Sequence, residues 1–155
     1  HMSYTIGEVA KKMNVAPSTL RYYDKEGLLP FIQRSENGIR YFTEKDFEIL
    51  SVIHCLKQAG ISIKDIKRYI DMIGEGDQSI DARLELFKKE KASVENRILE
   101  MQRTLAILEY KCWYYETSKK DGTMAYVDHM TPEEMPEKYA KIKRDLEKLD
   151  IVPSK

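Results

Sequence analysis

The sequence predicts a mainly α protein, in which a compact unit of short helices and one hairpin precedes a single long helix of the coiled-coil type. Short apolar stripes with helical spacing recur between residues 5 and 73, and capping residues or glycines bound them. From residue 80 to residue 115 the apolar pattern changes to a heptad repeat. These observations divide the chain into three predicted segments, residues 3–76, 80–117 and 118–155.

The first two predicted helices lie within residues 5–15 and 16–28. Thr5 and Glu8 have the spacing of a capping box, and Asn14 suits the left-handed residue at a helix end. Pro17 suits the first turn of the second helix, and Gly27 ends that helix. Two short helices joined by a turn of a few residues predict a helix-turn-helix.

A hairpin and two more helices are predicted to complete this unit. Residues 31–33 and 39–42 are β-prone runs that flank the polar turn RSENG, and a hairpin this small must pack on the helices. Thr43 and Asp46 predict a helix start, and Gly60 ends that helix after a stripe made of Ile49, Val52, Ile53 and Leu56. Ser62 begins a fourth helix, which ends near residue 76.

The heptad pattern predicts a coiled coil over residues 80–117. Apolar side chains follow one another from Ile80 to Tyr115 at steps of four and three residues, and Lys91 is the one charged residue among them. Such a helix exceeds about 50 Å, which is too long for a small domain to cover, so a second copy of the chain is the expected partner. An amphipathic helix packed on its own domain is the alternative interpretation. The predicted dimer interface consists of Leu84, Phe87, Val94, Ile98, Met101, Leu105, Leu108 and Cys112.

Residues 118–155 are predicted to form a loop followed by a last helix. Glycine and two prolines interrupt the first part, and the stripe of Tyr139, Ile142, Leu146 and Leu149 predicts a helix within residues 136–149.

Composition excludes several classes of protein. The 26 basic and 26 acidic residues balance, so net charge gives no indication of a nucleic-acid partner. No apolar run reaches the ~18 residues of a membrane span, and no signal peptide opens the chain. Two cysteines are too few for a disulfide framework, so we expect a reducing, cytoplasmic location. No group of Asp, His and Ser recurs with catalytic spacing, so we expect neither an enzyme nor a cofactor.

Two stretches of the chain, TIGEVAKKMNVAPSTLRYYDKEGLL and RSENGIRYF, closely resemble the MerR family of bacterial transcriptional regulators. The LRYY-D/E-x-x-GLL run and the R-x-x-x-G-x-R-Y pattern occur together at the family's spacing, over residues 4–76. Ile39 departs from the family pattern, since many members have tyrosine there. The resemblance implies a winged helix-turn-helix DNA-binding domain followed by a long antiparallel coiled-coil dimerisation helix. It also implies a homodimer on a palindromic promoter in double-stranded DNA, which distorts that DNA and so acts on RNA polymerase indirectly.

The adjacent tyrosines of the second helix fit this implied function. Leu20 and Tyr23 are spaced i, i+3 and are expected to pack inward, so Arg21 and Tyr22 are expected to point toward base edges and phosphates. A surface aromatic without a DNA contact is the alternative for Tyr22. The other expected contacts, partly by resemblance to the family, are to the DNA backbone, from Ser18, Thr19, Arg34, Asn37, Arg40 and Tyr41.

The effector is predicted less directly. The chain resembles MerR regulators that respond to reactive aldehydes or other thiol-modifying stress, which are short, lack a metal-binding loop and have a cysteine in the helix that contains Cys55 here. A small buried residue without chemistry is the alternative for Cys55, and the neighbouring His54 is either its base or a structural hydrogen-bonding group. Cys112 has no second thiolate after it, so no metal site is expected. The alternative function is a drug- or small-molecule-responsive regulator that binds its ligand at an aromatic site near Trp113.

Overall fold

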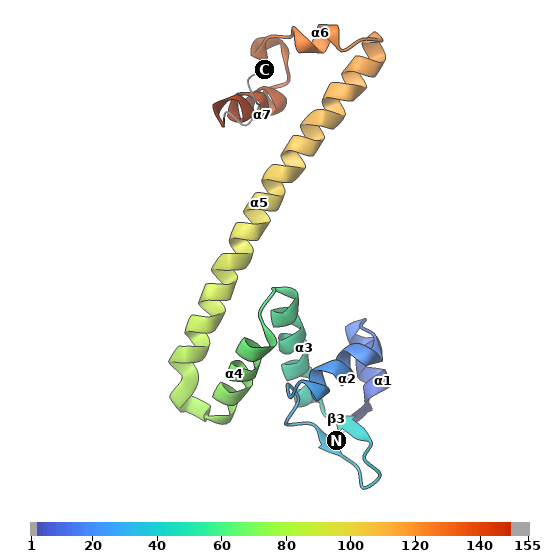
Figure 1. Cartoon of the computed structure of the whole chain (residues 1–155), viewed down its shortest axis with the longest axis vertical. Helices are drawn as coiled ribbons and strands as arrows, with labels where there is room; N and C mark the ends of the chain where they lie inside the picture. Colours follow the sequence, from blue (N-terminus) through green and yellow to red (C-terminus); the bar gives the residue numbers. More distant parts are fainter. Residues whose placement is uncertain (1–2, 150–155) are drawn as a thin grey trace. The chain divides into compact units, whose positions relative to one another are not determined.

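The computed structural model describes residues 3–149, and Figure 1 shows its elements. The chain divides into two compact units between Ala92 and Ser93. The long helix α5 (Ile80–Asp121) begins in the first unit and ends in the second.

Four short helices form most of the first unit: α1 (Ile6–Met13), α2 (Pro17–Lys25), α3 (Glu44–Gln58) and α4 (Ile63–Gly74). The predicted capping box at Thr5 and the predicted N-cap at Thr43 are confirmed. Both form capping boxes, in which the threonine side chain and the acidic side chain three residues later bond to one another's backbone amides. Asn14 has a φ of 57°, and the left-handed turn that it makes leads directly from α1 toward α2. The helix-turn-helix prediction is therefore confirmed in its local geometry.

The wing is part of a three-stranded sheet with the order β1-β3-β2. Strand β2 (Gln33–Arg34) pairs antiparallel with β3 (Arg40–Phe42), as the hairpin prediction requires, although β2 begins at residue 33 rather than 31. Phe31 instead packs against the helical core. Strand β1 (Tyr4–Thr5) was not predicted, and its pairing with Phe42 and Tyr41 attaches the hairpin to the start of α1.

One apolar core holds these helices and the sheet together. Helix α3 contributes Leu50, Ile53 and Leu56 to it. The predicted stripe of α3 missed Leu50 and included Ile49 and Val52, which are only half-buried. The other buried apolar residues are Val9, Ala10, Leu20, Tyr23, Leu28, Leu29, Phe42, Ile61, Ile66 and Ile70.

The second unit is built on the far half of α5. After the 3₁₀ turn η1 (Gly76–Ser79), α5 extends for 42 residues, four residues beyond the predicted end at 117. Gly122, with a φ of 76°, is where the helix stops. The predicted loop also contains the short helix α6 (Ala125–Asp128) and the 3₁₀ turn η2 (Pro132–Glu134), before the predicted last helix, α7 (Glu137–Lys148).

Within residues 3–149, no helix combines the length and the apolar character that crossing a membrane requires.

Candidate nucleic-acid interface

Helix α2 presents one face to the core and the other to solvent. Leu20 and Tyr23 are buried, whereas Arg21 is exposed and 45% of Tyr22 is exposed. This orientation confirms the predicted division of the helix into an inner and an outer face. The contacts of Arg21 and Tyr22 with DNA stay a prediction.

A partly buried hydrogen bond joins α2 to α3. The hydroxyl of Tyr23 lies 2.9 Å from Nδ1 of His54, and the two rings are 6.2 Å apart. Burial, and to a smaller degree the neighbouring Tyr22, raises the pKa of Tyr23, so the phenol stays protonated at neutral pH. Of the two roles considered for His54, the structural one is confirmed, because this bond satisfies a buried hydroxyl and sets the rotation of α2 about its own axis.

The start of α2 has no side-chain cap. Its N-cap residue is Ala16, which makes no side-chain hydrogen bond, and Pro17 is the first helical residue. The backbone amides of a helix start are oriented to meet an anion when no side chain satisfies them. The exposed Ser18 and the half-exposed Thr19 lie in this first turn, where the sequence predicted phosphate contacts.

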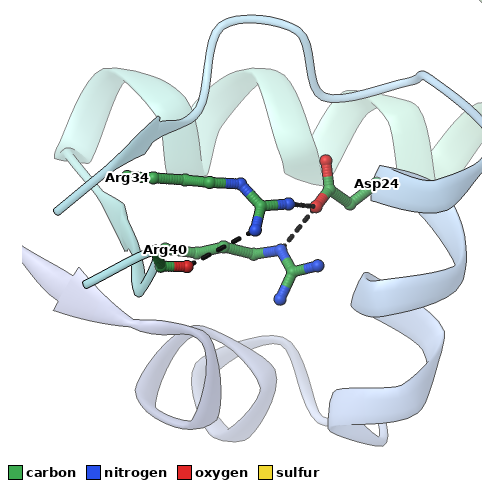
Figure 2. Close-up of polar contacts among 4 residues, drawn as sticks. Asp24, Arg34 and Arg40 are labelled. Atoms are coloured by element: carbon green, nitrogen blue, oxygen red, sulfur yellow. Dashed lines mark hydrogen bonds and ion pairs between the residues drawn. The ribbon is translucent and has the colours of Figure 1, made fainter. Parts of the chain in front are cut away.

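Arg34 and Arg40 of the wing converge on helix α2, as Figure 2 shows. Oδ2 of Asp24, on α2, accepts hydrogen bonds from Nη2 of Arg34 at 2.7 Å and from Nε of Arg40 at 2.5 Å. Nη1 of Arg34 also donates to the carbonyl oxygen of Gly38, at 3.4 Å. The structure therefore brings residues that are 10 and 16 positions apart in the chain onto one carboxylate.

The other wing residues behave differently. The Tyr41 hydroxyl donates to Oε1 of Gln33 across the two strands at 2.6 Å, and Asn37 lies exposed in the turn that Ser35 and Gly38 close. Arg34 and Arg40 are expected from the sequence to contact the DNA backbone, and their shared bond to Asp24 was not predicted. The available signal was the hairpin register, which sets the two arginines directly opposite one another and therefore requires a nearby counter-charge.

Both thiols are accessible. Cys55 on α3 and Cys112 on α5 are exposed, so the expectation that Cys55 is buried is wrong, while its reactivity stays a prediction. Among the described residues, His54 shares a hydrogen bond with the hydroxyl of Tyr23 and makes none with Cys55. In the part of the chain that the structure describes, no group of three or more His, Cys, Asp or Glu side chains could hold a metal ion.

The aromatic residues of the second unit stack on one another. The Trp113 ring lies 5.0 Å from the Tyr139 ring of α7, nearly parallel to it, and 6.1 Å from Tyr110. Nζ of Lys138 lies 2.7 Å from Oε2 of Glu109, and this hydrogen bond raises the pKa of Lys138. Because Tyr139 stacks on one face of the indole ring, a ligand on that face of Trp113 would have to displace Tyr139.

A second polar contact ties α6 to α5. The Tyr114 hydroxyl donates to Oδ1 of Asp128 at 2.5 Å, and this hydrogen bond raises the pKa of Tyr114 to about 12. The phenol therefore remains a donor at neutral pH. The neighbouring Tyr115 is exposed.

The predicted coiled-coil seam is exposed along α5. Leu84, Ile98, Met101, Leu105 and Leu108 all keep about half or more of their surface accessible. The alternative interpretation, in which the helix packs on its own domain along this seam, is wrong for these residues. Phe87 differs, because its ring meets that of Tyr69 edge-on at 5.2 Å.

Helix α7 leaves the seam free. It packs against the side of α5 that carries Ala106, Ile107, Tyr110 and Trp113. At about 100° per residue, these positions lie roughly opposite Leu105, Leu108 and Cys112 on the helix. The far half of α5 is thus apolar on two faces, of which the chain itself covers one.

Comparison with known proteins identifies the family. The model described as MerR HTH family regulatory protein matches residues 4–73, and the model described as MerR, DNA binding matches residues 47–110. An uncharacterized HTH-type transcriptional regulator of Haemophilus influenzae is 44% identical over 127 residues, which cover 82% of this chain and 94% of that protein. The HTH-type transcriptional regulator AdhR of Bacillus subtilis is 36% identical over 86 residues, which cover 56% of this chain and 61% of AdhR.

Solved structures agree with the sequence comparison. HiNmlR, described as a MerR family regulator lacking the sensor domain and bound to promoter DNA, superposes with a TM-score of 0.78 at 42% identity. The match covers 87% of this chain and 100% of HiNmlR. A MerR family regulator from Listeria monocytogenes matches with a TM-score of 0.66 at 30% identity, over 97% of this chain and 99% of that one. With identities of this size over nearly whole lengths, the chain belongs to the MerR family of helix-turn-helix regulatory proteins.

Proposed function

We propose that the protein is a sequence-specific transcriptional regulator that binds double-stranded promoter DNA as a homodimer, in the cytoplasm. The observation that carries this proposal is the outward face of α2, where Arg21 and Tyr22 project beside the buried Leu20 and Tyr23. The whole of HiNmlR matches 87% of this chain, and HiNmlR is a regulator bound to promoter DNA. This similarity supports the same partner here.

The proposed binding mode divides the contacts between base edges and backbone. A recognition helix fits the major groove, where an arginine can donate two hydrogen bonds to guanine, so Arg21 is assigned to base recognition. Tyr22 is assigned to the adjacent base or phosphate. The backbone contacts are assigned to Ser18, Thr19, Arg34, Asn37, Arg40 and Tyr41, which fix the register of the protein on the duplex.

The proposed dimer forms along the exposed seam of α5. Exposed apolar residues at heptad spacing over 42 helical residues need a partner helix, and an antiparallel second copy supplies an identical stripe. Lys91 within the stripe is assigned to setting the register, as a polar residue in such a seam does.

The proposed action on transcription is a distortion of the promoter. A dimer with two recognition helices at a fixed separation binds an inverted repeat, and it can bend or untwist the spacer between the half-sites. Such a deformation costs roughly 1–6 kcal/mol, which the contacts made in the active state must offset. RNA polymerase is then affected indirectly, through the altered alignment of its promoter elements.

Footprinting of the DNA upstream of the protein's own gene tests this proposal. We expect protection of two half-sites related by a dyad, with a binding constant that falls steeply as salt rises, because lysines and arginines neutralise phosphates. Uniform protection with no preferred site would contradict the proposal.

The proposed trigger is modification of Cys55 by a thiol-reactive compound. The thiol is exposed on α3, the helix that holds α2 through the bond between His54 and Tyr23. An adduct next to His54 therefore lies one residue from the contact that sets the rotation of the recognition helix. A two-state interface can amplify such a local change.

Brief treatment with a limiting amount of electrophile should label Cys55 before Cys112, because the proposed dimer covers the seam that holds Cys112. Mass spectrometry of the dimer measures the order of labelling. The Cys55→Ser variant should lose the response of a reporter strain, and Cys112→Ser should keep it. A fully responsive Cys55→Ser variant would end the idea.

A small-molecule effector is the second candidate. A cavity of about 480 Å³ lies between α5 and α7, and Ala106, Ile107, Ile142 and Leu146 are among its lining residues. Ile142 and Leu146 also pack against the aromatic cluster, so a ligand there would disturb the stack of Trp113 on Tyr139. Fluorescence of Trp113, the only tryptophan in the chain, reports such displacement.

A further inference from the structure

The recognition helix carries a carboxylate close to the surface proposed to meet a polyanion. Asp24 is mostly buried, with 16% of its side chain exposed, and both of its charged partners come from the wing (Figure 2). Arg40 is also largely covered, whereas half of the Arg34 side chain is exposed. A negative charge near DNA normally weakens binding, so this carboxylate needs a reason other than contact with the nucleic acid.

The wing strands explain why a counter-charge is needed here. Arg34 and Arg40 are directly opposite in the register of β2 and β3, and like charges in such a pair repel. Oδ2 of Asp24 accepts a hydrogen bond from each arginine, and such charge-assisted bonds are about twice as strong as neutral ones. One oxygen atom therefore joins both strands of the wing to α2.

The rest of the sheet does not replace this link. Strand β1 pairs with β3 at Tyr4–Phe42 and Thr5–Tyr41. This pairing does not include Arg40, the next residue of β3 toward the turn. From Arg40 to the turn the wing is a two-stranded ribbon, which is barely stable without outside contacts. The bonds to Asp24 lie at the place where the third strand ends.

The geometry also leaves Arg40 able to bind a second anion. Its Nε–H donates to Asp24 (Figure 2), and among the described residues no hydrogen bond engages its two terminal nitrogens. A guanidinium offers five N–H groups in a fixed plane, so one edge can hold a carboxylate while another meets a phosphate. Asp24 thus orients Arg40 and leaves other N–H groups of its guanidinium available for a phosphate.

We propose that Asp24 is a positioning residue for DNA recognition: it holds the wing arginines at a fixed distance from α2, so that wing and helix engage the same half-site in register. The inference rests on the proposed function and adds a specificity role that touches no base. The positioning role also has opposite consequences for the two kinds of DNA. Removing the charge of Asp24 should strengthen binding to random DNA, because a repulsive charge disappears, while weakening the preference for the operator.

The test is Asp24→Asn, which keeps the shape of the side chain and removes its charge. Binding to an operator duplex and to a random duplex is measured by fluorescence anisotropy over a range of salt concentrations. We expect the ratio of operator to random affinity to fall by about tenfold, the effect of losing roughly one charge-assisted hydrogen bond. Affinity for the random duplex should rise, with a steeper salt dependence.

Glu26→Gln is the matched control. Glu26 is the C-cap residue of α2, two positions after Asp24, and its replacement by glutamine removes one negative charge, as Asp24→Asn does. This variant should leave the ratio unchanged. Arg40→Lys should lower the ratio as Asp24→Asn does while keeping the salt slope, because lysine keeps the charge and lacks the Nε–H. An unchanged ratio in Asp24→Asn, or an equal fall in Glu26→Gln, would overturn the inference.

A readout without DNA separates the two levels of the proposal. Amide hydrogen exchange in residues 35–41 should accelerate in Asp24→Asn and stay unchanged in Glu26→Gln, because the hydrogen bonds from the wing arginines to Asp24 form in the protein without DNA. Unchanged exchange in Asp24→Asn would overturn the positioning role even if DNA binds. Failure of the unmodified protein to prefer any operator would instead contradict the proposed function, whatever the exchange data show.

Discussion

Replacing Leu105 and Leu108 with lysine should convert the protein into a monomer and abolish its binding to an inverted repeat. The two leucines are 53% and 58% exposed in the single chain, on the face of α5 opposite Ala106 and Tyr110. Burying each leucine in a dimer contributes roughly 1.5–3 kcal/mol, and the double variant would instead bring four ammonium groups into the seam of a dimer. Sedimentation equilibrium measures the mass in solution.

The control is a pair of lysines that precede the two leucines on α5 and lie outside the heptad positions, at Glu100 and Gln102, which are exposed. This pair should remain dimeric. Circular dichroism should show the same helix content in the seam variant as in the unmodified protein at low temperature, since α7 still covers the opposite face. A Leu105→Lys, Leu108→Lys variant that stays dimeric would show that the heptad assignment is wrong.

The second large effect is expected for Arg21→Ala. A bidentate contact between an arginine and a guanine provides about 1–3 kcal/mol of discrimination, so operator affinity should fall by about one to two orders of magnitude. Affinity for random DNA should fall far less, and the two values should converge. Competition binding with operator and random duplexes at fixed salt measures both.

Arg144→Ala is the matched control for Arg21→Ala. Arg144 is an exposed arginine on α7 that pairs only with the exposed Glu137 among the described contacts, so its loss should change neither affinity. An Arg21→Ala variant that binds the operator as tightly as the control does would end the assignment of α2 as the recognition helix.

The helices of this protein could be predicted because their signals are local. In each capping box, a threonine and an acidic residue three positions later bond to one another's backbone amides, as in Thr5 with Glu8 and Thr43 with Asp46. The whole interaction therefore lies within four consecutive residues. The heptads of α5 are equally local, since the spacing alone sets which side chains share a face. Tertiary contacts play no part in either.

What escaped prediction depends on contacts between distant residues. The two-residue strand β1 is too short to show alternation and exists because β3 lies beside it. Leu50 is buried because α3 has neighbours on more than one side, which a single stripe does not describe.

The site shows the same division. The outward direction of Arg21 and Tyr22 follows from helical spacing, so the sequence could predict it. The link from Asp24 to Arg34 and Arg40 joins a helix to a hairpin across 10 and 16 residues, and no periodicity connects them. The stack of Tyr139 on Trp113 joins α7 to α5 in the same way, so the sequence could not show which residue covers this face of the indole ring.

Selection from a pool of random duplexes tests most directly whether a dimer presents two copies of α2 to one DNA site. The unmodified protein is incubated with the pool at physiological salt, and the bound duplexes are amplified and sequenced over several rounds. We expect enrichment of an inverted repeat, with two equal half-sites at one fixed spacing. Enrichment of a single half-site, of half-sites at variable spacing, or of no sequence at all would contradict it.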